Sequence, residues 1–217
     1  VRLTGSIVRQ LQVVFVGDWA FETDEIPEGP DVFPELAATG EMLAQAAPTG
    51  PSEESGPLER VVLAGINGAR ESLVITTPYF VPGESMTLAL MMAADRGVQV
   101  ELVVPRRSDH PLVTMAGRAS FERLLAAGVV IHEFRDGVLH AKTMTVDDDF
   151  AMIGSSNMDI RSFQLNLEIS VLLYGEAVTR RLHREQRRYI ERSVRVEAEA
   201  WARRPWWARY GQNAAAL

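Results

Sequence analysis

The chain has 217 residues, of which 47% are hydrophobic, so it holds enough apolar material for one large domain or two small ones. It has no cysteine, which excludes disulfides, thiolate metal sites and a cysteine nucleophile. Its four histidines, His110, His132, His140 and His183, lie too far apart for a zinc-ligand spacing, so a metal enzyme is disfavoured.

The net charge of −7 is unevenly distributed along the chain. Residues 1–56 hold 10 acidic and 2 basic side chains, whereas residues 57–217 are close to neutral. Residues 176–210 carry 10 arginines against 5 glutamates. A nucleic acid would therefore find no broad basic face, apart from a local one near the C-terminus.

The first predicted elements form an acidic front segment. Apolar residues at helical spacing predict a helix over residues 5–21, with Ser6 as its N-cap. The acid-, Pro- and Gly-rich stretch 22–41 predicts a long connection, and "PTGPSEESG" at 48–56 predicts a second break. We therefore place residues 1–56 in a front segment and residues 57–217 in a separate domain.

From residue 57 onward, helical and strand patterns alternate. Such alternation is typical of an α/β fold in which helices cover both faces of a largely parallel sheet. Helices are predicted at 57–70, 84–97, 112–128 and about 175–200, and strands at 72–80, 98–105, 129–134, as a pair around 139–154, and at 167–173.

The strand pair carries the residues with the clearest chemistry. Residues two apart in a strand point to the same face, so His140 and Lys142 place an imidazole beside an ammonium. The aspartates at 147–149 turn the chain, and the returning strand brings the loop at 155–157 back toward His140. A histidine with cationic and amide donors suits a phosphate-ester site that needs no metal.

Glu168 is an acid within the apolar strand "LNLEISVLL", where it needs a partner. By holding one ring nitrogen of His140, it would fix the tautomer of that imidazole. Each residue alone has a structural explanation: a core histidine, a solvated lysine, a turn aspartate or a structural ion pair. Together, the six positions of this pattern arise by chance only about once in a hundred million starting points.

The pattern His140-x-Lys142-x4-Asp147-x6-Gly154-Ser155-x-Asn157 resembles the HKD signature of the phospholipase D superfamily at every position. Longer stretches, including "ITTPYFVPGES", "AADRGVQVELVVPRRSD" and "IGSSNMDIRSFQLNLE", resemble bacterial cardiolipin synthases. The resemblance covers nearly the whole chain and is most specific at 72–174. It implies a phospholipase D-like α/β domain with a mostly parallel mixed sheet, and no cofactor or metal.

The resemblance also implies roles for the residues of the site. Relatives carry two HKD motifs: one histidine attacks phosphorus, and the other protonates the departing alcohol and deprotonates the incoming one. This chain carries only the second motif, so we expect a C-terminal half that is inactive by itself. The implied catalytic set is His140 as acid/base, Lys142, Asp147 supporting the loop, and Glu168 orienting the histidine, with Lys142, Ser155 and Asn157 binding the phosphate.

The implied reaction transfers a phosphatidyl group between two phosphatidylglycerols, through a phosphohistidine, to give cardiolipin and glycerol. Implied partners are phosphatidylglycerol, an anionic membrane surface, and either the first HKD half or a second copy of this chain, with no nucleic acid. The full-length protein would lie at the bacterial inner membrane, and the fragment would be soluble. The alternatives are a hydrolytic phospholipase D or nuclease, and a non-catalytic lipid-binding half.

Residues outside the HKD pattern are further candidates. Arg106 and Arg107 follow a strand, where they would bind a headgroup phosphate or lie in a solvated loop. Tyr79 also ends a strand and is interpreted as core packing or cleft wall, and His110 as a surface residue. "RRPWWARY" at 203–210 suits either a membrane interface or a packing helix.

Overall fold

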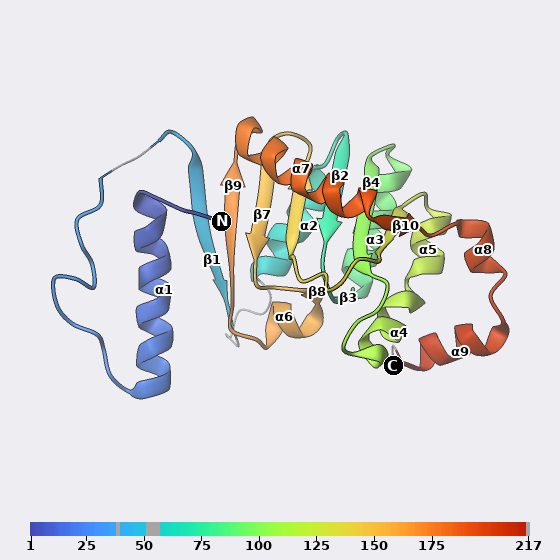
Figure 1. The fold of residues 1–217 in the computed structure, drawn as a ribbon, viewed down its shortest axis with the longest axis horizontal. Helices are drawn as coiled ribbons and strands as arrows, with labels where there is room; N and C mark the ends of the chain where they lie inside the picture. Colours follow the sequence, from blue (N-terminus) through green and yellow to red (C-terminus); the bar gives the residue numbers. More distant parts are fainter. Residues whose placement is uncertain (38–39, 51–56, 216–217) are drawn as a thin grey trace.

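The computed structural model describes residues 1–37, 40–50 and 57–215 (Figure 1). Its main sheet runs in the order β1-β9-β7-β6-β2-β4-β5-β10, and β3 and β8 form a separate pair. The strands are β1 (Leu43–Thr49), β2 (Ser72–Thr76), β3 (Phe80–Val81), β4 (Gln99–Pro105), β5 (Val130–Phe134), β6 (Thr143–Val146), β7 (Phe150–Gly154), β8 (Met158–Asp159), β9 (Glu168–Tyr174) and β10 (Ser193–Arg195). The helices are α1 (Ser6–Thr23), α2 (Pro57–Gly68), α3 (Glu84–Asp95), α4 (Pro111–Ala119), α5 (Phe121–Ala126), α6 (Ile160–Gln164), α7 (Glu176–Glu191), α8 (Ala198–Ala202) and α9 (Trp206–Ala215).

The α/β class is confirmed, but the balance of strand directions differs from the prediction. In the described part of the main sheet, only β2 with β4 and β4 with β5 run parallel. The other neighbours are antiparallel, including the hairpin β6–β7 and the strands β9 and β1 beyond it. Strands joined by a short turn have to run antiparallel, so the HKD hairpin itself makes this half of the sheet antiparallel. The expectation of a mostly parallel sheet is therefore wrong.

Helices cover both faces of the sheet, as predicted (Figure 1). Leu73 and Ile75 of β2 belong to the large core that includes α2 and α3. Val74, between them, belongs to a core on the other face with Tyr189 and Ile190 of α7. This alternation follows from the strand repeat of two, and it explains why β2 is an almost continuous apolar run.

Several predicted elements differ from the structure in extent. The strand expected at 72–80 ends at Thr76 as β2, and Phe80 belongs to the separate strand β3. The helix expected at 112–128 is interrupted at Ser120, which separates α4 from α5, and the helix expected at 175–200 ends at Glu191. The front helix is confirmed as α1, although Gly5 rather than Ser6 is its N-cap. None of the described helices is long and apolar enough to cross a membrane.

Strand β1 was not predicted: most of it lies between the expected connection at 22–41 and the expected break at 48–56, and its last two residues, Pro48 and Thr49, fall in that break. It pairs with β9 along its whole length, from Leu43 opposite Tyr174 to Thr49 opposite Glu168. The front segment therefore contributes an edge strand to the main sheet. The remainder of the expected break, residues 51–56, lies outside the described residues.

A buried glutamine in α7 fastens the helix to the strands that lead to the HKD motif. The amide nitrogen of Gln186 donates to the carbonyl of Val74 and to Thr143 Oγ1, both at 3.1 Å. Its amide oxygen accepts from Thr145 Oγ1 at 2.7 Å. Because buried polar groups are costly unless paired, these bonds fix α7 across β2 and β6.

Candidate active site

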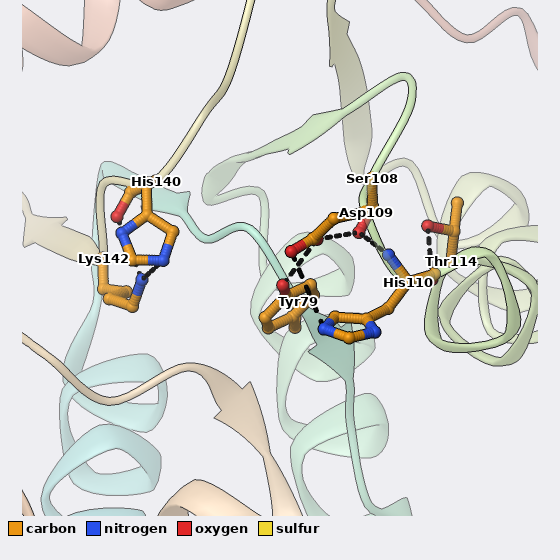
Figure 2. Close-up of polar contacts among 7 residues, drawn as sticks. All are labelled: Tyr79, Ser108, Asp109, His110, Thr114, His140 and Lys142. Atoms are coloured by element: carbon orange, nitrogen blue, oxygen red, sulfur yellow. Dashed lines mark hydrogen bonds and ion pairs between the residues drawn. The ribbon is translucent and has the colours of Figure 1, made fainter.

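His140 and Lys142 lie in an extended segment that leads into β6. Lys142 Nζ is 3.2 Å from His140 Nε2 and donates to the carbonyl of His140 at 3.0 Å (Figure 2). Lys142 is buried, with 8% of its surface exposed, whereas the His140 ring is exposed. The prediction that the two side chains project together is confirmed.

The pairing of an ammonium with an imidazole determines what the site can bind. An ammonium group has donors only, so the nitrogen of His140 that faces Lys142 accepts and carries its lone pair there. Burial lowers the pKa of Lys142, and attraction to Glu168 partly offsets this by raising it. An incoming phosphate oxygen would accept from the same ammonium and leave His140 Nε2 free for proton transfer or attack.

The hairpin returns as predicted, and Gly154 is required at its end. Strands β6 and β7 pair from Thr143 opposite Ile153, and the Gly154 amide donates to the carbonyl of Lys142 at 3.2 Å. A Cβ on Gly154 would lie 2.4 Å from Ser170 Oγ and 2.5 Å from the carbonyl of Ile169. Only glycine therefore lets β7 approach β9 this closely while holding the backbone of Lys142.

The next residue, Ser155, is predicted to bind phosphate, but its hydroxyl is used to hold the loop. Ser155 Oγ accepts from the amide of Ile169 at 3.0 Å and donates to the carbonyl of the same residue at 3.4 Å. The backbone amide of Ser155 donates to that carbonyl as well, at 2.9 Å. These bonds fix the loop against β9, so loop positioning is the role that the contacts of Ser155 support.

Asn157 and Glu168 are joined through Ser162, a residue that the sequence did not single out. Asn157 Nδ2 donates to Ser162 Oγ, which donates to Glu168 Oε1, both at 3.3 Å. Asn166 Nδ2 also donates to Glu168 Oε1 at 3.3 Å. Asp159 caps α6 by accepting from the Ser162 amide, and this Asp-x-x-Ser spacing was the available sequence signal. Glu168 thus acts electrostatically on Lys142 from within a hydrogen-bonded group.

The amide oxygen of Asn157 is buried and has no hydrogen-bond partner among the described residues. Its amide nitrogen is already used by Ser162, so the side chain is oriented rather than free to rotate. Glu168 accepts its hydrogen bonds from Ser162 and Asn166. Its predicted bond to His140 stays a prediction for the assembled site.

Asp147 lies at the other end of β6 from His140, in the turn of the hairpin. Its carboxylate accepts from the backbone amides of Arg70, Glu71 and Ser72, with the Glu71 and Ser72 bonds at 2.8 and 2.9 Å. Its own backbone has φ 47°, which aspartate tolerates better than most residues. These contacts support the expected role in the loop, and they keep the carboxylate away from proton transfer.

Replacing Asp147 with alanine should destabilise the fold without removing the chemistry. Three backbone donors lose a charged acceptor, so we expect the free energy of unfolding to fall by about 2–4 kcal/mol. The D147N variant keeps an acceptor, and asparagine tolerates positive φ, so its loss of stability should be smaller. Urea unfolding monitored by tryptophan fluorescence measures both. A D147A protein that is folded at low temperature but lacks activity would contradict this role.

Changing Glu168 to glutamine should shift the pH dependence of activity. In the role expected for it, Lys142 acts in its protonated form, so activity should be present below its pKa and lost as the pH rises through it. Because Glu168 raises that pKa, E168Q should lower it and move the alkaline limb of the pH–rate profile to lower pH. Asp148, paired with Arg180 at the far hairpin turn, provides a control. An E168Q profile that coincides with that of D148N would contradict the coupling.

Arg106 and Arg107 follow β4 at the end of the sheet where the HKD segment enters β6. Both side chains are exposed, and neither side chain makes a hydrogen bond or ion pair within the described part of the chain.

Tyr79 and His110 lie next to the same loop. Tyr79 is half-buried, and its hydroxyl donates to Asp109 instead of packing in the core. The His110 side chain is 63% exposed, as predicted. No group of three or more metal-ligating side chains is found among the described residues.

Comparison with known proteins agrees with this geometry. The family described as "Cardiolipin synthase, PLD-like domain" matches residues 62–190. Cardiolipin synthase A of Yersinia pseudotuberculosis serotype O:1b (strain IP 31758) is 37% identical over 212 residues, which is 96% of this chain and 43% of that protein. Cardiolipin synthase A of Yersinia pestis bv. Antiqua (strain Angola) gives the same values. The chain thus spans less than half the length of these curated relatives.

Solved structures show the same fold at low sequence identity. Nuc from Salmonella typhimurium, a phospholipase D family member, has a TM-score of 0.62 at 20% identity and covers 72% of this chain and 99% of that chain. Phosphatidylserine synthase from Haemophilus influenzae Rd KW20 has a TM-score of 0.61 at 18% identity, over 79% of this chain and 45% of that chain. Since the family match spans more than half of its residues, the chain belongs to the cardiolipin synthase family of phospholipase D-like domains.

Proposed function

We propose that this chain is one catalytic half of a phosphatidyltransferase that converts two phosphatidylglycerols into cardiolipin and glycerol. The observation that carries the proposal is the 3.2 Å contact between Lys142 Nζ and His140 Nε2, in a chain of the cardiolipin synthase family. In this reaction Lys142 neutralises charge on the phosphoryl oxygens, and His140 moves the proton of the departing or arriving alcohol.

The exposure of His140 supports a site that is completed by a second surface. A double displacement through phosphohistidine needs two histidines, and this chain offers one of them in an HKD motif. We propose that a first motif, in a longer polypeptide or in a second copy of this chain, supplies the nucleophile and the facing wall of the cleft. The exposed ring of His140 would then be enclosed only after pairing.

Two further features suit a lipid substrate at a membrane. The unpaired Arg106 and Arg107 at the end of β4 would bind the phosphate of an anionic headgroup. Trp206 and Trp207 are exposed at the start of α9, and amphipathic indole rings favour the interface between water and lipid headgroups. We propose that this side of the molecule faces an anionic bilayer during catalysis.

The test is an assay of the protein at its natural length, in vesicles that contain labelled phosphatidylglycerol. The expected products are cardiolipin and free glycerol in equal amounts. H140A should strongly slow the formation of both, whereas D148N, in the distant hairpin turn, should not. Phosphatidic acid as the main product of the unaltered protein would instead indicate a hydrolytic phospholipase D. Cleavage of nucleic acid in place of lipid would overturn the proposal.

A further inference from the structure

A second polar cluster lies in the segments that follow β2 and β4 (Figure 2). Tyr79 Oη donates to Asp109 Oδ1 at 2.7 Å, and Ser108 Oγ donates to the same oxygen at 3.0 Å. The second carboxylate oxygen, Oδ2, lies 3.7 Å from His110 Nε2. The rings of Tyr79 and His110 are 5.7 Å apart and inclined by 59°. The four side chains therefore form one connected group.

The register of the sheet places this cluster at the same end of the strands as the HKD segment. Thr76, the last residue of β2, pairs with Thr143 on one side and with Val103 of β4 on the other. Tyr79 follows β2, and its carbonyl accepts from the amide of Met158, directly after the Gly-Ser-Ser-Asn loop. In Figure 2, Tyr79 lies between the His140–Lys142 pair and His110.

The cluster is ordered and yet open to solvent. The side chains of Asp109 and His110 are 73% and 63% exposed. The hydrogen bond from Tyr79 lowers the pKa of Asp109, and the same bond raises the pKa of Tyr79, so near neutral pH the pair is a carboxylate and a phenol. Solvent screens exposed polar pairs strongly, so the fold itself gains little from this arrangement.

The separation of Asp109 Oδ2 from His110 Nε2 defines what would fit between them. At 3.7 Å the two atoms are too far apart for a direct hydrogen bond. A hydroxyl group bound beside both would donate to the carboxylate and accept from the imidazole N–H. The negative charge of Asp109 disfavours a phosphate here, so the cluster favours a neutral polyol. The free cations, Arg106 and Arg107, lie two to three residues earlier in the same loop.

We propose that Tyr79, Asp109 and His110 form a subsite for the vicinal diol of a glycerol headgroup and so select a polyol over water as the acceptor. This inference rests on the proposed phosphatidyltransferase function. Arg106 and Arg107 hold the phosphate of the acceptor lipid, and the neighbouring cluster holds its 2-hydroxyl. The order of these residues along the loop thus matches the order of groups along a phosphoglycerol headgroup.

The subsite positions the reacting group without itself reacting. The terminal hydroxyl oxygen of the acceptor forms a bond to phosphorus as the bond from phosphorus to the nucleophilic histidine breaks, and its proton passes to His140. The 2-hydroxyl, bound by Asp109 and His110, keeps its proton and remains in the product. By microscopic reversibility the same subsite holds the glycerol that departs from the donor lipid.

The experiment compares acceptors that differ only in that hydroxyl. The protein at its natural length receives a p-nitrophenyl ester of phosphatidic acid as donor. Acceptors are phosphatidylglycerol or phosphatidyl-1,3-propanediol in vesicles, and free glycerol or 1,3-propanediol in a parallel arm. Transfer products and phosphatidic acid are quantified by mass spectrometry. The unaltered protein should prefer the glycerol member of each pair.

In D109N, transfer to the glycerol compounds should fall roughly tenfold relative to hydrolysis, because a charged acceptor is lost. Transfer to the propanediol compounds should stay unchanged, which separates hydroxyl recognition from a structural role. Tyr79→Phe should weaken the preference less, since it frees Asp109 without removing it. D148N should match the unaltered protein. A preference confined to the lipid arm would show that the headgroup, rather than free glycerol, is the ligand.

Equal losses for both members of a pair in D109N would overturn the proposal, as would an unaltered protein with no preference for glycerol. Failure of the proposed function gives a different result. A protein that makes no cardiolipin from phosphatidylglycerol alone, yet shows a glycerol preference that depends on Asp109, has the subsite but a different natural donor.

Discussion

In the proposed reaction, replacing His140 with alanine is expected to slow transfer from phosphatidylglycerol by about 10²–10⁴-fold, the usual contribution of general acid–base catalysis. Glycerol is a poor leaving group, and without His140 it departs without a proton. The His140 side chain is exposed, so its removal leaves no cavity in the core, and the fold should be preserved. Steady-state rates with labelled phosphatidylglycerol and an unfolding curve measure the two effects.

A donor with a better leaving group distinguishes the two histidine roles. Nitrophenolate needs little proton assistance, so the first step with a p-nitrophenyl donor should survive in H140A. Rapid-mixing measurements should show a burst of nitrophenol and an accumulating phosphohistidine on the other motif. Complete loss of the burst in a folded H140A protein would reverse the assignment and make His140 the nucleophile.

Replacing Lys142 with methionine should slow transfer by roughly 10²–10³-fold with both donors, because it removes a charge that stabilises the phosphoryl oxygens whichever group departs. Methionine has a similar length and no charge, and the position is only 8% exposed, so the substitution tests charge rather than volume. Equal losses of the burst rate and of the steady-state rate are the expected signature.

Lys142→Arg provides the matched comparison. The Lys142 ammonium contacts both the ring and the carbonyl of His140. Arginine keeps the positive charge, but its planar guanidinium has a different shape and donor geometry from the compact ammonium. We expect partial activity, above that of the methionine variant. A methionine variant that slows only the phosphatidylglycerol reaction would assign Lys142 to the leaving group instead of the phosphoryl oxygens.

The local parts of the fold and site could be predicted because their signals are short-range. The hairpin β6–β7 follows from two apolar runs around an aspartate turn, and the contact between His140 and Lys142 follows from their spacing of two. The sequence "LAQAAPT" of β1, by contrast, has small side chains and a proline. It becomes a strand only because β9 offers it a partner, and such long-range pairing leaves no periodicity to read.

The same distinction explains which site residues were missed. Ser162 joins Asn157 to Glu168 only because α6 turns the chain there. With five residues, α6 is too short to show a helical periodicity in the sequence. Tyr79 and Asp109 are thirty residues apart and meet because their strands, β2 and β4, are neighbours. His110 was correctly predicted to be exposed, but exposure alone gave no indication of the carboxylate beside it.

Lys142 is the only lysine in the sequence, since the other basic side chains are arginines. Its burial lowers its pKa, so at mildly alkaline pH a larger share of it is the free amine that acylating reagents attack. Apart from an N-terminal amino group, an amine-selective reagent has a single target in this chain. Covalent labelling therefore becomes a direct measure of site occupancy, because the proposed lipid substrate would protect Lys142 from modification.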